Sequence, residues 1–235
     1  MEIRVVQNVL KLNDEVAALN RRALADAGVA CLNIMGSPGC GKTALLESTL
    51  PRLRPELSIG VITGDIATTR DAERLADLCD AVTQINTGGS CHLDANQVRQ
   101  GLANLPLPAL DLVIIENVGN LICPVTFDLG QGAKVGLFSV PEGADKPAKH
   151  PRIVLEADVL VLTKTDLLPY VPFDKRVFLA DLRSLREDVP LIETSVVSGL
   201  GLDAWCDWVR RFVAARGTTR TQHGTHDEVS QSFAE

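Results

Sequence analysis

The chain has 235 residues, and its 23 Lys and Arg against 30 Asp and Glu give a formal net charge of −7 at pH 7. This acidic balance argues against a general binding surface for nucleic acid or for anionic membrane, because both carry negative charge. No apolar run reaches the roughly 18 residues of a membrane span, and the first residues do not resemble a secretory signal. The six cysteines are irregularly spaced, unlike a disulfide framework. We therefore expect a cytoplasmic protein with reduced thiols that binds neither nucleic acid nor membrane.

The apolar pattern predicts a series of helices and strands. An N-terminal helical segment covers about residues 1–28, with Asn13 or Asp14 as a candidate cap and Gly28 as a candidate end. Pro51 is expected to end the helix that follows the first strand. The pattern predicts strands at 30–35, 58–65, 81–87, 111–118, 135–140, 158–163 and 189–193, and further helices at 44–50, 69–79, 93–105, 173–187 and 202–215.

Strands that alternate with helices predict an α/β fold, in which a mostly parallel sheet has helices on both faces. The N-terminal helix is an addition to this pattern and is expected to pack on the sheet. Residues 1–216 then form a single domain. Residues 217–235 are almost entirely polar and have little to bury, so we expect a disordered tail there.

A glycine-rich stretch lies between the first strand and the helix after it, and it fits the phosphate-loop pattern G-x-x-x-x-G-K-[ST]. In such a loop the backbone N–H groups and the helix N-terminus bind phosphate oxygens. Lys42 is expected to lie between the β- and γ-phosphates, and Thr43 to offer its hydroxyl to Mg²⁺. The alternative is a chance glycine-rich turn. It is disfavoured because the predicted strand, loop and helix follow one another in the order that a phosphate loop requires. The predicted nucleotide-binding residues here are Gly36, Ser37, Pro38, Gly39, Cys40, Gly41, Lys42 and Thr43.

Two carboxylates follow apolar strands, at the edge of a parallel sheet where ligands bind. Asp65 ends the second predicted strand and Glu116 stands near the end of the fourth. A carboxylate in such a position is costly unless it is paired or lies near a cation. Either residue can hold Mg²⁺, directly or through water, or orient the water that attacks a phosphate. The alternative is that one of them only caps the next segment. Together with Lys42, these two residues are the predicted catalytic groups.

A third strand end carries a candidate base-recognition motif. Thr163, Lys164 and Asp166 resemble the Asn-Lys-x-Asp signature of GTPases, with threonine in place of asparagine. A carboxylate at this point accepts two hydrogen bonds from guanine, and adenine has no such donor pair. A solvated salt bridge is the alternative for an isolated motif of this kind. Ser195 and Val196 resemble the loop that completes a GTPase base pocket.

Three further residues have the chemistry of a soft-metal site. Cys91 and His92 are adjacent in one predicted loop, and Cys123 follows the next strand. Thiolates and imidazole suit Ni²⁺, Zn²⁺ or Cu⁺ better than Mg²⁺. From spacing alone, ordinary core cysteines remain an alternative, which is also what we expect of Cys79 and Cys206.

Taken together, these motifs resemble the HypB family, the nickel-inserting GTPases of hydrogenase maturation. The resemblance rests on residues 2–5, 13–15, 36–43, 64–65, 69–72, 86–88, 91–95, 116–121, 123–124, 127–130, 142–147 and 166–170. It implies a SIMIBI-class P-loop GTPase that hydrolyses GTP slowly and forms a GTP-dependent homodimer. It also implies a metal site formed by Cys91, His92 and Cys123, with nickel as cargo, although zinc would bind the same ligands. A hydrogenase precursor and a partner nickel metallochaperone are the implied partners.

Two alternatives to this function remain. A urease-type nickel GTPase usually carries Cys-Pro-His where this chain has Cys91 and His92. A metal-binding module that uses nucleotide only as a switch would bind GTP without significant turnover. A P-loop kinase fits less well, because no lid for a phosphate acceptor is evident in the sequence.

Overall fold

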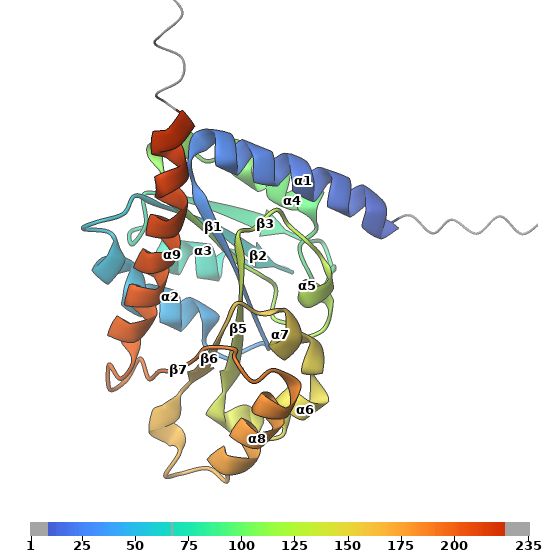
Figure 1. The fold of residues 1–235 in the computed structure, drawn as a ribbon, viewed down its shortest axis with the longest axis vertical. Helices are drawn as coiled ribbons and strands as arrows, with labels where there is room; N and C mark the ends of the chain where they lie inside the picture. The colour runs from blue at the N-terminus through green and yellow to red at the C-terminus, as the bar shows by residue number, and fades with distance from the viewer. Residues whose placement is uncertain (1–8, 67, 224–235) are drawn as a thin grey trace, which may run out of the picture.

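The computed structural model describes residues 9–66 and 68–223, and within them seven parallel strands form one sheet (Figure 1). The strand order is β3-β2-β4-β1-β5-β6-β7. The predicted α/β fold with a parallel sheet is therefore confirmed. The strands are β1 (Ala30–Gly36), β2 (Ile59–Asp65), β3 (Ala81–Asn86), β4 (Leu112–Glu116), β5 (Ala133–Ser139), β6 (Val159–Thr163) and β7 (Leu191–Glu193).

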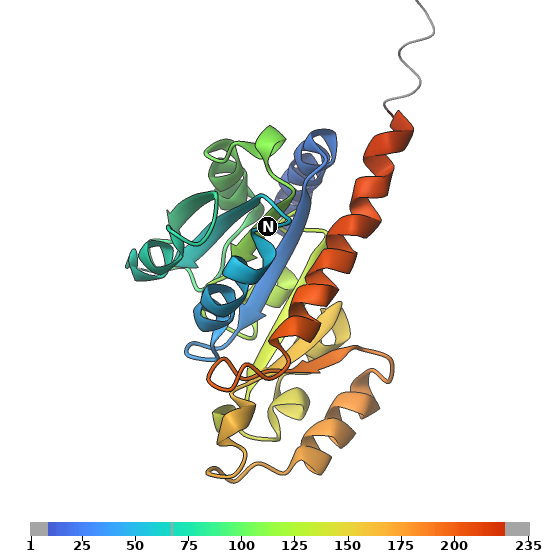
Figure 2. The ribbon, with the colours of Figure 1, turned by 90° about the vertical axis from the view of Figure 1, so that its left-hand side faces the viewer.

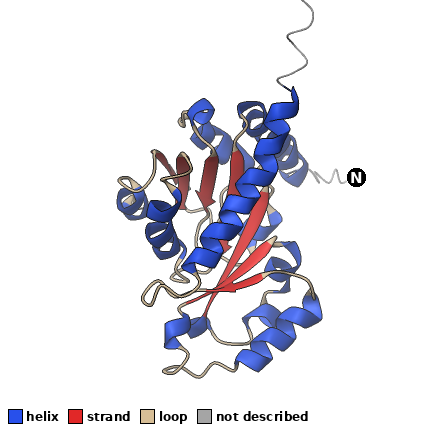
Figure 3. Ribbon diagram, turned by 60° about the vertical axis from the view of Figure 1, so that its left-hand side comes forward, coloured by secondary structure: helices blue, strands red, loops and turns tan. Residues whose placement is uncertain are grey.

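Helices cover both faces of this sheet, and the longest of them, α9, runs across one face (Figures 2 and 3). The described α-helices are α1 (Val9–Ala27), α2 (Lys42–Leu53), α3 (Arg70–Leu75), α4 (Ala95–Ala103), α5 (Cys123–Thr126), α6 (Lys146–Lys149), α7 (Pro151–Glu156), α8 (Lys175–Leu185) and α9 (Leu202–His223). The described residues also contain three 3₁₀ turns: η1 (Leu107–Ala109), η2 (Val140–Glu142) and η3 (Thr165–Leu167).

The apolar side chains divide between the two faces. Helices α2, α3 and α9 pack on one face, where Trp205 of α9 is fully buried. Helices α1 and α4 cover β1, β2 and β4 on the opposite face, and α7 and α8 cover β5 and β6 beside them. Strand β1 contributes buried side chains to both faces of the sheet. Leu32 packs on the face covered by α2, α3 and α9, and Cys31 packs on the face covered by α1 and α4. A strand buried on both faces is a continuous apolar run, which is why this pattern was predictable.

The N-terminal helix α1 is held by two buried asparagines. The Asn20 amide donates to the carbonyls of Ala95 and Leu129, at 2.8 and 3.0 Å. Asn13 donates to the Asp128 carbonyl and accepts the N–H of Ala95. The prediction of Asn13 or Asp14 as a helix cap is wrong, because α1 begins at Val9 and contains both residues. The predicted end is correct: Gly28 has a φ of 70° and the Val29 N–H bonds the Leu24 carbonyl.

Two helices continue beyond the ends that the sequence predicts. Helix α2 continues through Pro51 to Leu53, since a proline near a helix C-terminus removes a single intrahelical hydrogen bond. Helix α9 continues to His223, so residues 217–223, predicted as the start of a disordered tail, are helical. Residues 1–8 and 224–235 lie outside the described part of the chain, together with the predictions made for them.

A search of the described helices for a segment long and apolar enough to cross a membrane found none.

The asparagine contacts lead to a stability prediction. Replacing Asn20 by alanine leaves two buried carbonyls without their donor, so the free energy of unfolding should fall by about 1–3 kcal/mol. Urea denaturation of the purified protein measures this change. Asn104→Ala is the matched control, because its exposed amide bonds the carbonyl of Gln100 in the neighbouring turn of α4. A loss for Asn20→Ala no larger than for the control would contradict the anchoring role.

Candidate functional site

The carboxyl ends of β1, β2 and β4 border a cavity of about 500 Å³. Parallel strands end at the same edge of a sheet, which is where ligands bind in such folds. Of the predicted site residues, the cavity contacts Pro38, Gly39, Gly41, Lys42, Thr43, Asp65, Glu116 and Lys164. These residues come from four separate segments of the chain, and the fold brings them together.

The phosphate loop has the backbone conformation that its glycines permit. Gly39 and Gly41 have φ values of 72° and 101°, a region that other residues rarely adopt. Gly36 has no room for a Cβ, which would lie 2.5 Å from the Cys40 sulfur. The Lys42 ammonium lies 3.2 Å from the Gly36 carbonyl oxygen and 3.3 Å from that of Ser37. The loop therefore holds a buried positive charge at the N-terminus of α2.

The loop contacts the end of β4 through a buried hydrogen bond. The Thr43 hydroxyl donates to Glu116 Oε1 at 2.6 Å. The second oxygen, Glu116 Oε2, is buried and has no hydrogen-bond partner among the described residues. Burial raises the pKa of the Glu116 carboxyl from its ordinary 4.5 to about 7. An unpartnered carboxylate oxygen beside a hydroxyl is the oxygen donor set that a hard cation such as Mg²⁺ prefers.

Asp65 lies at the end of β2 and lines the same cavity. Its Oδ1 accepts the N–H of Thr68 at 2.9 Å, so it also organises the turn that follows the strand. Both functions considered for this residue, cavity group and cap of the next segment, are compatible with this position.

Two charged residues of the cavity were not among the predicted site residues. Asp71 and Arg74 of α3 both line this cavity. Arg74 Nε lies 2.7 Å from Glu47 Oε1, and its guanidinium also pairs with Asp71 at 3.3 Å. A signal in the sequence could have indicated these two residues. Asp71 and Arg74 are oppositely charged, three residues apart, and lie in the helix that follows Asp65 at the end of a strand.

The predicted base-recognition residues are joined to the phosphate loop and to one another. The Thr163 hydroxyl donates to the Cys40 carbonyl at 2.5 Å, and Lys164 Nζ to the Gly39 carbonyl at 2.6 Å. Ser195 is buried, and its hydroxyl donates to Asp166 Oδ1 at 2.6 Å. Val196 follows it and is exposed. Threonine at position 163 therefore still bonds the phosphate loop, through its hydroxyl.

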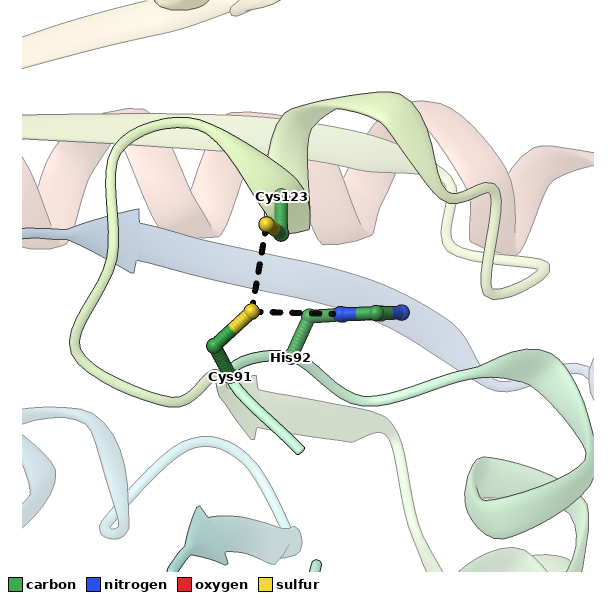
Figure 4. Close-up of side chains that lie close together, drawn as sticks. All are labelled: Cys91, His92 and Cys123. Atoms are coloured by element: carbon green, nitrogen blue, oxygen red, sulfur yellow. Dashed lines mark hydrogen bonds between the residues drawn. The ribbon is translucent and has the colours of Figure 1, made fainter. Parts of the chain in front are cut away.

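Cys91, His92 and Cys123 come together (Figure 4). They adjoin the cavity lining through Asn120, which follows Gly119 of that lining and bonds the Cys91 carbonyl. The two sulfurs are 3.1 Å apart, and Cys91 Sγ lies 3.8 Å from His92 Nδ1. One candidate ligand atom from each residue lies within 4.8 Å of the other two. Burial lowers the pKa of His92, which favours the neutral imidazole that binds metals. Its ring packs on Phe127, with centroids 3.9 Å apart.

The other predicted cysteine positions agree with a core role. Cys31, Cys79 and Cys206 are buried, and burial raises the pKa of all three thiols. Cys40 is fully buried inside the phosphate loop, and burial raises its pKa to about 11. The accessible thiols among the described residues are therefore Cys91 and Cys123.

Comparisons with known proteins establish the family. Residues 30–193 match the family described as the nucleotide-binding domain of CobW, HypB and UreG. The hydrogenase maturation factor HypB of Azotobacter vinelandii is 43% identical over 216 residues, or 92% of this chain and 70% of that protein. The chain belongs to the HypB family.

Solved HypB structures share the fold. The hydrogenase maturation factor HypB of Archaeoglobus fulgidus has a TM-score of 0.81 and 39% identity, covering 87% of this chain and all of that one (100%). HypB of Helicobacter pylori, solved in complex with nickel, has a TM-score of 0.82 and 33% identity, covering 87% of this chain and 96% of that one. The predicted HypB resemblance is thus confirmed, and the family match includes both the phosphate loop and the thiol cluster.

The raised pKa of Glu116 predicts a pH dependence of stability. A folded pKa of about 7 lies above the unfolded value, so the stability from protonated Glu116 is complete below about pH 4.5 and is lost as pH rises through 7. Glu116→Gln keeps a neutral side chain at every pH. Without nucleotide or divalent metal, its free energy of unfolding relative to wild type should therefore rise between pH 4.5 and 7, by on the order of 3 kcal/mol. A difference that stays constant over this range in urea denaturation would contradict the assignment.

Proposed function

We propose that this HypB-family chain is a slow GTPase and metallochaperone that delivers nickel during hydrogenase maturation. The observation that carries the proposal is the Cys91, His92 and Cys123 cluster, whose two segments are joined through Asn120 to the phosphate loop. A nucleotide site explains the buried Lys42 and Glu116, and a soft-metal site explains two accessible thiols that lie 3.1 Å apart. A function that used only nucleotide would not explain the thiol cluster, and a function that used only metal would not explain the phosphate loop.

The nucleotide phosphates would bind along residues 36–43. Lys42 would exchange two backbone carbonyls for phosphate oxygens, and the N-terminus of α2 would add its partial positive charge. Thr43, Asp65 and Glu116 are the residues that would hold Mg²⁺, which supplies charge neutralisation to the phosphates. Asp65 or Glu116 would orient the attacking water. Arg74, which also lines the cavity, would add a second positive charge for the phosphates.

Guanine specificity is proposed for Asp166, with Lys164 along the base. Lys164 has a φ of 58°, the one positive value among the described non-glycine residues, and its ammonium bonds the phosphate loop. The Ser195 hydroxyl donates to Oδ1 of Asp166, which orients the carboxylate. The second oxygen of this carboxylate and the remaining lone pair of the first can then accept the two guanine donors.

Nickel is proposed as the cargo of the thiol cluster. Two thiolates and one imidazole leave a coordination position open, which suits a metal ion that is passed on. Zn²⁺ would bind the same ligands. HypB of Helicobacter pylori, which is 33% identical to this chain, was solved in complex with nickel. This supports Ni²⁺ as the proposed cargo.

A GTP-dependent homodimer is also proposed, with a hydrogenase precursor and a partner nickel metallochaperone as recipients or donors. Ile66 and Ile122 support it, because they are 48% and 62% exposed on the loops next to the two sites. Burial of such side chains against a second copy would be favourable. The metal ligands can then belong to one protomer or be shared by two.

The guanine assignment predicts a change of base specificity. Asp166→Asn replaces an acceptor by an amide that donates where xanthine has a carbonyl. GTP affinity should fall by about tenfold or more, and affinity for xanthosine triphosphate should rise. Calorimetric titration with both nucleotides measures this exchange. Asp188→Asn is the matched control, because its side chain is 84% exposed and its ion pair among the described residues is with Arg186. Unchanged affinities in the Asp166 variant would show that another group recognises the base.

The metal assignment predicts selective loss of one site. Cys123→Ala should abolish stoichiometric Ni²⁺ binding and its near-ultraviolet thiolate band, and leave GTP affinity within about twofold. Binding should also release protons and weaken as pH falls, because thiolates must be deprotonated. Cys79→Ala and Cys206→Ala are the controls, since both thiols are buried. If those controls lose the band and Cys91→Ala and Cys123→Ala keep it, the wrong thiols have been assigned. Nickel binding with no GTP turnover would favour the switch module over the GTPase.

A further inference from the structure

Asn120 lies between the phosphate loop and both metal-binding segments. Its backbone N–H donates to the Gly36 carbonyl at 2.9 Å, which pairs the two residues in an isolated antiparallel bridge. Its side-chain amide donates to the Cys91 carbonyl at 3.3 Å. Its side-chain oxygen accepts the N–H of Ile122 at 2.9 Å, one residue before Cys123. A single residue therefore contacts the nucleotide loop and both thiol-bearing segments.

The Gly36 carbonyl is shared by the two sites. It accepts the Asn120 N–H and also lies 3.2 Å from the Lys42 ammonium. A phosphate that draws the ammonium away leaves this carbonyl to Asn120 alone. The residue before Asn120 also packs closely on the phosphate loop. A Cβ on Gly119 would lie only 2.9 Å from the Pro38 Cα. These two contacts give a change in the phosphate loop a direct path to residues 119 and 120.

We propose that Asn120 is a positioning residue that couples nucleotide state to the geometry of the Cys91 and Cys123 pair. This inference rests on the proposed function, because it presupposes that GTP and metal bind at the two sites. The backbone bond of Asn120 follows the phosphate loop. Its side chain carries that movement to Cys91 through one hydrogen bond and to the start of α5 through another. The spacing of the two sulfurs then differs between nucleotide states.

Coupling of this kind is a reciprocal change in affinity. For the wild-type full chain, we expect the Kd for Ni²⁺ to differ by about fivefold or more between the GDP-bound form and a form bound to a non-hydrolysable GTP analogue. The near-ultraviolet thiolate-to-nickel band should differ between the two forms as well. Titration with nickel salt in thiol-free buffer gives both quantities. The reverse titration, of the analogue with and without Ni²⁺, should give the same factor.

The deciding variant is Asn120→Ser. A serine hydroxyl can still accept the Ile122 N–H in a local turn, but it is too short to reach the Cys91 carbonyl. Nickel stoichiometry and GTP affinity should remain, while the ratio of the two Kd values falls to within about twofold of one and the band becomes the same in both forms. Asn104→Ser, in which the lost side-chain bond lies at the end of α4, is the matched control and should keep the wild-type ratio.

The possible outcomes separate this inference from the proposed function. A wild-type ratio that persists in Asn120→Ser overturns the inference and leaves the proposed function standing. Loss of nickel or GTP binding in Asn120→Ser also overturns it, because Asn120 would then be holding one site instead of linking two. A wild-type ratio of one, with both ligands bound, removes the coupling itself, and the inference falls with it.

Discussion

The parallel pairing of β1 with β4 is the constraint on which both candidate sites depend. Ile34 pairs with Glu116 in this register, so the phosphate loop and the segment after β4 leave the sheet side by side. Thr43 can then donate to Glu116, and Asn120 can bond the carbonyl of Gly36. The segment continues to Cys123, which brings a thiol next to the loop that follows β3. Because each of these contacts is short and local, a shift in this pairing would disrupt both sites.

The same region contains groups whose burial is costly. Lys42 and Glu116 are 7% and 3% exposed, and Glu116 Oε2 has no hydrogen-bond partner among the described residues. Buried charged and polar groups are normally paired, so an exception indicates either a strained site or a missing ligand. A nucleotide with its cation would satisfy both residues. The thiol cluster is different, since Cys91 is exposed and His92 and Cys123 are partly exposed.

Much of the fold was predictable because it depends on local patterns. The seven strands are short apolar runs, and the phosphate loop has its own spacing, so both were located from the sequence. Contacts between distant segments were not predictable in this way. The asparagine anchors of α1, Arg74 in the cavity wall and the bonds of Asn120 join segments whose proximity only the folded chain reveals. Cys91, His92 and Cys123 were chosen on chemistry, and their role as metal ligands remains a prediction.

GTP turnover of the purified full chain, measured with and without one equivalent of Ni²⁺, tests the central claim most directly. The claim is that two neighbouring sites act as one device. A device of this kind must hydrolyse GTP, and metal at the thiol cluster must change the rate. The change must also disappear in a Cys91→Ala variant that still hydrolyses GTP. An identical rate with and without bound nickel would mean that the two sites share an edge of the sheet and nothing more.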